Sequence, residues 1–215
     1  MKIKKLILNL FTLIIATGFI TGCASDNYKK GARTAAALTK SSDTITKGNT
    51  LIDKSLAKLN DLVSNPNPNL RKQFKAFKAS VNDLGSTAKD IASQAEEMKS
   101  QGVAYFAKWD EEAAKMRNED IRNRSEARKN EVASRFERIS QHYDETKTAF
   151  RPFLSDLRDV QRFLATDLTA GGLAAIRDVA AKANRDAMPV QASLGKLSEE
   201  FKGLGLSMSL TVPAQ

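Results

Sequence analysis

The feature that most constrains this chain is a seam of apolar residues that recurs alternately every three and four positions. Such a heptad pattern predicts helices that pack side by side along a shared core. The seam occurs in four segments, which start at Tyr28, Leu70, Val132 and Leu173. Four segments in a chain of 215 residues predict an all-α fold, namely an elongated antiparallel four-helix bundle or coiled coil with up-down-up-down order.

Proline and glycine residues set the expected helix ends. The stretch SNPNPN after the first seam cannot continue a helix, and Asn67 is the expected cap of the second helix. Gly171 and Gly172 are expected to close the third helix. Pro152 and Pro189 lie inside seams that keep their phase, so we expect a kink at each of them and no helix end.

The second seam is lost between Arg117 and Glu131, where few residues are apolar. We expect the chain to turn near Asn118, because acidic residues follow it and favour a helix start. The two middle helices would then have about 50 residues, against about 30 to 36 for the outer two, so residues 103–133 would project as a hairpin. The alternative is one straight helix over residues 68–168, since the polar segment contains neither glycine nor proline.

The chain begins with a segment typical of export. Three lysines among the first five residues precede an apolar run of roughly 15 residues, which matches the charge and length of a secretory signal. A membrane-spanning helix needs about 20 apolar residues, so this run is too short to be one.

The only cysteine, Cys23, follows this run in the stretch Ile20-Thr21-Gly22-Cys23. This stretch resembles the lipobox of bacterial lipoproteins. The resemblance implies cleavage before Cys23 and acylation of its thiol, usually also of the new amine. Two or three acyl chains give stable membrane attachment. The alternatives are an ordinary signal peptide with an incidental cysteine, or an uncleaved N-terminal anchor.

Ala24 stands where inner-membrane lipoproteins carry an aspartate, so for a Gram-negative cell the resemblance implies an anchor in the outer membrane that faces the periplasm. Cleavage would remove three lysines from the 34 basic residues and leave 31 against 25 acidic ones, a net charge of +6. Such a charge suits anionic lipids or an acidic wall polymer, although an ordinary solvated surface explains it more simply. The expected layout is a signal peptide at 1–22, a lipidated linker at 23–27, a helical bundle at 28–204 and an extended tail at 205–215.

A second resemblance covers most of the mature chain. The stretch YFAKWDEEAAKMRNEDIRNRSEARKNEVASRFERI, followed by PFLSDLRDVQRFLATDLT, resembles a family of helical bacterial lipoproteins known only as a domain of unknown function. The residues that carry it are Trp109, Ser125 and Arg128. It implies no activity.

The residues give little support for an enzyme. His142 is the only histidine, so a multi-histidine metal site is excluded. The Ser-x-x-Lys spacing of penicillin-recognising enzymes occurs three times, but without its companion motifs. The carboxylates are scattered along charged helix faces and form no isolated pair for acid–base work. We therefore expect no enzyme, no cofactor and no metal, and an exported protein is a poor candidate for a nucleic-acid partner.

Aromatic and basic residues gather in the expected hairpin. They have two interpretations: packing within the hairpin, or a docking surface for an envelope protein, the cell wall or anionic headgroups. The candidate interaction residues are Tyr105, Phe106, Trp109, Arg122, Arg124 and Arg128. The sequence thus favours a non-enzymatic helical scaffold or interaction module of the cell envelope, held at the membrane by N-terminal acyl chains. A membrane-active protein that binds or remodels lipid and a hydrolase are the alternatives, and the oligomeric state stays open.

Overall fold

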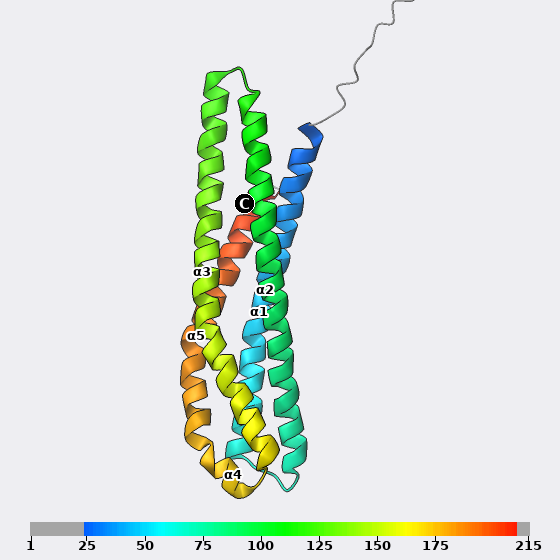
Figure 1. The fold of residues 1–215 in the computed structure, drawn as a ribbon, viewed down its shortest axis with the longest axis vertical. Helices are drawn as coiled ribbons and strands as arrows, with labels where there is room; N and C mark the ends of the chain where they lie inside the picture. The colour runs from blue at the N-terminus through cyan, green and yellow to red at the C-terminus, as the bar shows by residue number, and fades with distance from the viewer. Residues whose placement is uncertain (1–23, 210–215) are drawn as a thin grey trace, which may run out of the picture.

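The computed structural model describes residues 24–209 and shows a long bundle of α-helices (Figure 1). The described residues contain no strand, which confirms the predicted all-α class. The helices are α1 (Ala24–Ser64), α2 (Leu70–Ala114), α3 (Glu119–Thr166), the short α4 (Ala170–Ala175) and α5 (Arg177–Met208).

The four long helices run antiparallel and close into a ring. The most extensive packing is that of α1 against α5 and α2, and α3 completes the ring through smaller contacts with α2 and α5. The α1–α2 turn and α4 lie at one end of the bundle (Figure 1). The α2–α3 turn projects at the other end, beyond the start of α1 and the end of α5. The hairpin interpretation is therefore confirmed, and the single straight helix is wrong.

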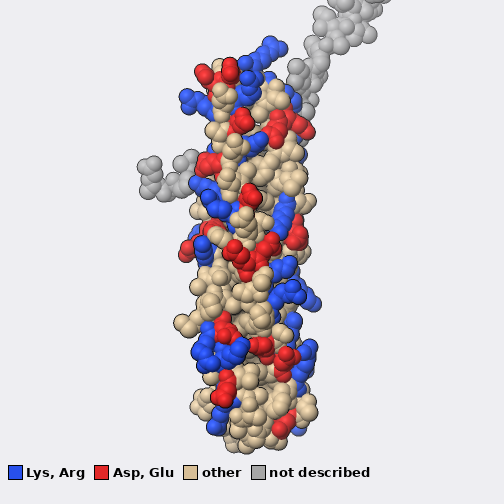
Figure 2. All heavy atoms as spheres, turned by 60° about the vertical axis from the view of Figure 1, so that its left-hand side comes forward, with Lys and Arg blue, Asp and Glu red and all other residues tan. Residues whose placement is uncertain are grey.

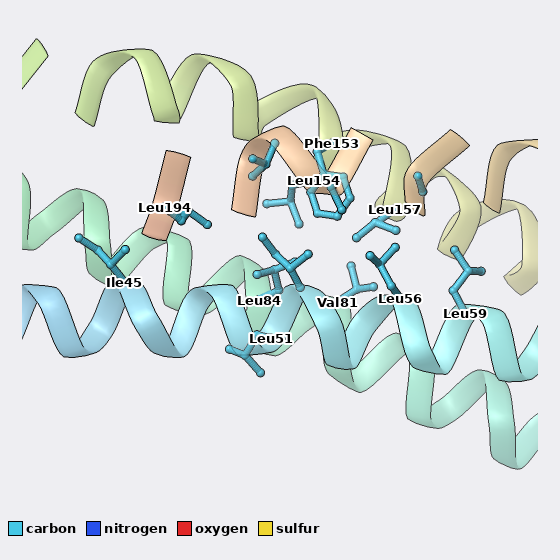
Figure 3. Packing of buried hydrophobic residues seen from close by; sticks show 14 of the residues in the cluster. Ile45, Leu51, Leu56, Leu59, Val81, Leu84, Phe153, Leu154, Leu157 and Leu194 are labelled. Carbon is cyan, nitrogen blue, oxygen red and sulfur yellow. The ribbon is translucent and has the colours of Figure 1, made fainter. Parts of the chain in front are cut away.

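The predicted seams form the core. Every member of the fourth seam, from Leu173 to Leu204, is buried, and side chains from all four long helices meet at mid-bundle (Figure 3). Fully burying one such apolar side chain contributes about 1.5–3 kcal/mol. The largest fully buried residues are Leu38, Ile45, Ile52, Leu59, Leu62, Phe77, Leu84, Leu157, Leu164, Leu197, Phe201 and Leu204.

A second buried stripe of α1 consists mostly of small or polar residues spaced seven apart: Thr34, Ser41, Gly48 and Ser55. The buried hydroxyl of Ser55 donates to the carbonyl of Leu51 on its own helix, at 2.8 Å. At Gly48 this stripe lets α1 approach α2 closely, because a Cβ there would lie 3.2 Å from the Ile91 side chain.

Polar seam residues connect α1 to α5. The hydroxyls of Ser42 and Ser198 are 2.9 Å apart, and Asn60 and Asn184 exchange hydrogen bonds of 2.9 Å through their amides. Each such bond is satisfied in only one alignment of the two helices, because a shift would leave buried polar groups unpaired. They therefore favour the observed register.

Two helix ends differ from the expected ones. The second helix is capped by Asn69, whose side chain accepts from the Lys72 N–H, while Asn67 supports the turn by accepting from the Asn69 N–H at 2.8 Å. The third helix ends earlier, at Thr166. Gly171 and Gly172, which were expected to close it, lie inside α4.

The fourth seam is divided between α4 and α5, which meet at Ile176. Pro152 lies inside α3 and Pro189 inside α5, so neither proline ends its helix, as predicted.

Two expected boundaries are wrong where the structure describes them. The predicted linker at 23–27 is helical from Ala24 onward, because α1 begins there. The predicted extended tail at 205–215 is helical as far as Met208, where α5 ends. Gly205 belongs to this last turn and packs against α1, since a Cβ there would lie 3.1 Å from the Ala35 carbonyl oxygen. The lipobox residues and Cys23, like residues 210–215, lie outside the described residues.

Candidate functional site

The hairpin turn is built by local side chains at the junction of α2 and α3. The side chain of Asn118 accepts from the Ile121 N–H at 3.2 Å and so caps α3 as expected. Glu119 lies in the first turn of α3, where a negative charge complements the helix dipole. Arg122 donates from Nη1 to the Met116 carbonyl at 3.4 Å, so its guanidinium supports the turn.

The aromatic residues form a small packed group below this turn. The Tyr105 ring meets the rings of Phe106 and Trp109 edge-on, each at a centroid distance of 5.5 Å, and Phe106 meets Phe136 at 5.9 Å. The indole N–H of Trp109 donates to the Ser125 hydroxyl at 2.8 Å. These three candidate aromatics are half-buried, and they join α2 to α3 as the packing interpretation predicts.

Tyr105 also connects the hairpin to the start of α1. A Cβ at Gly31 would lie 3.6 Å from the Tyr105 ring, an ordinary van der Waals contact, so the ring packs against α1 at this point. Burial raises the pKa of the Tyr105 hydroxyl above its ordinary value, while the nearby positive charge of Arg128 opposes that shift. The hydroxyl is therefore neutral at physiological pH.

The three candidate arginines play different parts. Arg128 pairs with Glu131 at 2.6 Å and donates to the Ser207 carbonyl at 3.0 Å, so it ties α3 to the last turn of α5. The hydrogen bond from Arg128 lowers the pKa of Glu131, and the positive charge adds to that shift. Arg124 is exposed and has no hydrogen bond or ion pair with any described residue. Of the candidate residues, Arg124 alone is unengaged within the described chain.

Charge is balanced along the hairpin. Residues 103–133 contain seven basic and seven acidic residues, a net charge of zero, and Lys129 pairs with Asp110 across it. Figure 2 shows both signs at this end of the molecule. The excess positive charge of residues 24–209 therefore lies elsewhere, and the Coulomb attraction of the hairpin to an anionic membrane is weak.

A cavity of about 630 Å³ lies between α2 and α3 in the middle of the bundle, where these two helices pack less extensively than α1 does with its neighbours. Small residues open it, and Gly85 is one example. A Cβ there would lie 2.6 Å from the Arg158 guanidinium, which crosses α2 at this point. The apolar wall is formed by Leu84, Ile91, Phe150, Leu154, Leu194 and Leu197.

The polar groups of the cavity are mostly basic. Lys89, Lys147, Arg151 and Arg158 line it without a carboxylate among the lining residues, and none of the four forms an ion pair with any described residue. Sequence reasoning missed this site, because glycines and alanines within a seam look like ordinary helix contacts.

Tyr143 lines one end of the cavity. It is only 4% exposed, and its hydroxyl has no hydrogen-bond partner among the described residues. Burial raises the pKa of this hydroxyl, and the negative charges of Glu96 and Asp144 add to the shift. The group therefore stays protonated near neutral pH and can donate a hydrogen bond.

The sequence was compared with known protein families, curated proteins and solved structures. The profile of a family described as a protein of unknown function, DUF2959, matches residues 27–198. The chain belongs to the DUF2959 family. The match spans the hairpin with its Trp109–Ser125 bond and both walls of the cavity. Neither the curated proteins nor the solved structures gave a significant match.

His142, the single histidine of this DUF2959 protein, has a partner on another helix. Its Nδ1 lies 2.8 and 2.7 Å from the two carboxylate oxygens of Glu200, so it joins α3 to α5. Both side chains are about a quarter exposed. The contact gives His142 a structural role between the two helices.

Among the described residues, no group of three or more histidine, cysteine, aspartate or glutamate side chains is placed to hold a metal ion. Within residues 24–209, no helix combines the length and the hydropathy that crossing a membrane requires.

Proposed function

We propose that this DUF2959 protein is a lipid-anchored, non-enzymatic interaction module of the cell envelope. The observation that carries the proposal is the placement of the hairpin. The α2–α3 turn projects past the outer helices at the same end of the bundle where α1 starts (Figure 1). Cys23, the expected anchor, directly precedes the first residue of α1 in the sequence. The anchor and the hairpin are therefore expected to face the same membrane.

The partner that best fits this arrangement is an envelope protein at the membrane surface. A hairpin without net charge gains little from anionic headgroups, whereas a protein partner can contact its exposed side chains one by one. Ile121, an apolar residue in the first turn of α3, is 52% exposed and lies close to the turn. A cell-wall polymer remains the alternative partner.

The anchor is tested by substitution of Cys23. The variant Cys23→Ser should incorporate no labelled palmitate and should leave the detergent phase, because the thiol that carries the acyl chains is gone. A Ser25→Ala variant of the same chain serves as the control and should label normally. Equal labelling of Cys23→Ser and the natural chain would contradict the anchor.

The hairpin is tested by crosslinking in intact cells. A photoactivatable residue at Ile121 should give a discrete protein adduct. The control is the same residue at Met188 on α5, which is 69% exposed but far from the turn. Adducts to lipid alone at Ile121 would favour the membrane-remodelling alternative, and identical adducts at both positions would contradict a docking role of the hairpin.

A further inference from the structure

We propose that the cavity between α2 and α3 binds a single-chain anionic amphiphile, with the acyl chain along the apolar wall and the anionic head on the basic residues of its rim. This site is distinct from the hairpin, and the proposal does not depend on the hairpin's partner. Fatty acids and anionic lysophospholipids share this chemistry.

The shape of the cavity fits one acyl chain. Its volume of about 630 Å³ lies within the range of about 300–1,000 Å³ for small-molecule sites. Along α3 the lining extends from Tyr143 to Arg158, which at 1.5 Å per residue is about 22 Å. One leaflet of a bilayer core is roughly 15 Å thick, so an extended acyl chain fits within this length with room for a polar head.

The charges select the sign of the head. Four basic side chains line the cavity, none is neutralised by an ion pair with a described residue, and the lining contains no carboxylate. An anionic head would receive charge-assisted hydrogen bonds from them, and these are stronger than neutral ones. Arg158 is already held across α2 by the space at Gly85.

Acidic groups determine where the head lies. The negative charges of Glu96 and Asp144 lie near the Tyr143 hydroxyl, and Asp144 also pairs with Lys99 at 3.4 Å. The Tyr143 end of the cavity is therefore less positive than the other end. The anionic head is therefore expected near Lys89, Arg151 and Arg158, with the chain directed toward Tyr143. The Tyr143 hydroxyl has no hydrogen-bond partner among the described residues and is available to a polar group of the ligand or to a water beside it.

The test uses the full chain in intact cells that are supplied with a palmitate carrying a diazirine near the end of its chain. On illumination the diazirine loses nitrogen, and the resulting carbene inserts into adjacent bonds. We expect light-dependent adducts on the peptide that contains Tyr143 and Thr146, because the chain end is directed toward them. Probe attached to Cys23 is independent of light and lies in a different peptide. The adduct mass distinguishes a fatty acid from a lysophospholipid.

Two variants with matched controls decide the outcome. Ala88→Trp fills the cavity and should abolish most of the cavity adducts, whereas Ala79→Trp, at an exposed position of the same helix, should not. Replacing three rim residues by Gln should lower the labelling by about tenfold, the loss of roughly one charge-assisted contact. The control removes three exposed lysines of α2. The rim variant is Lys89, Arg151 and Arg158 to Gln, and its control is Lys72, Lys75 and Lys78 to Gln.

The rim variant leaves the core unchanged, so it remains informative if Ala88→Trp fails to fold. The proposal is overturned if adducts spread evenly over the surface, or if the rim variant labels like its control. It is also overturned if cavity adducts form only after residues 210–215 are deleted, since that segment would then be the occupant. Adducts that carry a two-chain phospholipid would show that a bilayer lipid occupies the cavity, and they would contradict the proposal of a single-chain ligand.

Discussion

The helices α2 and α3 run through both the body of the bundle and its hairpin end, but different interactions hold them in the two regions. In the body, α2 and α3 share a core with α1 and α5, and side chains such as Phe77 and Leu157 are fully buried. At the hairpin end, no hydrophobic residue between Met98 and Val132 is buried. Half-buried aromatics, one indole hydrogen bond and exposed ion pairs take the place of that core.

The difference predicts unequal local stability. Burial of apolar area is the dominant favourable term in folding, whereas exposed ion pairs contribute about 0–1 kcal/mol each. The hairpin end should therefore open locally at a lower free energy than the body, without global unfolding. A region that opens easily can adapt to a partner, which agrees with the proposed docking role of the hairpin.

The largest effect is expected from truncating the core of the body. Phe77→Ala leaves a cavity beside side chains that are fully buried, and we expect a loss of about 3–5 kcal/mol in the free energy of unfolding. Chemical denaturation of residues 24–215, followed by circular dichroism, measures it. A loss below about 1 kcal/mol would mean that the body is packed no better than the hairpin.

A smaller effect is expected at Gly102, where the two regions meet. A Cβ at this position would lie 2.3 Å from the ring of Phe136, so Gly102→Ala forces the ring and α3 to shift. Overpacking of this kind costs about 1–3 kcal/mol, partly offset by the better helix propensity of alanine. Gly203→Ala is the matched control, because nothing lies within 4 Å of its Cβ, and it should stabilise by up to about 1 kcal/mol. Gains of equal size in both variants would show that Gly102 is not under a packing constraint.

The sequence predicted the body of the fold better than its ends. Heptad seams are long and repetitive, so they identified the buried face of the helices, as the fully buried fourth seam shows. Helix boundaries depend on single capping residues. Asn69 caps the second helix in place of the expected Asn67, and the heptad pattern does not contain the geometry of the turn between them. Gly172 shows the same limit of prediction. It was expected to end a helix, but it is required by a close approach of the chain to itself, since a Cβ there would lie 2.2 Å from the Asp167 carbonyl oxygen.

The candidate site was only partly predictable. The aromatic group could be found because its spacing continues the second seam, and its packing within the hairpin was one of the two expected interpretations. The engagement of Arg128 with Ser207 could not be foreseen, since it joins residues 79 positions apart. The cavity was missed for a related reason. It lies between α2 and α3, which pack less extensively than α1 does with its neighbours, and the apolar period does not contain the spacing between helices.

An effect smaller than that at Gly102, and confined to the hairpin, is expected from Ser125→Ala. The substitution leaves the half-buried indole N–H of Trp109 without its partner, which costs about 1 kcal/mol. Ser134→Ala is the control, since this serine is exposed on the same helix and the gain in helix propensity is equal. Hydrogen exchange should accelerate in residues 105–125 only in the Ser125→Ala variant. Acceleration throughout the chain would show that the hairpin and the body unfold as one unit.

The smallest effect separates two arginines of the hairpin. Arg128→Gln removes the contact to the Ser207 carbonyl and the pair with Glu131, and we expect a loss of less than about 1 kcal/mol, because these groups are partly exposed. Its readout is faster hydrogen exchange in the last turn of α5, which loses its tie to α3. Arg124→Gln carries the same change in charge but removes no contact with a described residue, so neither stability nor exchange should change measurably. If the two variants behave alike, Arg128 acts only through its charge. If Arg124→Gln alone weakens the Ile121 crosslink, the free guanidinium belongs to the docking surface.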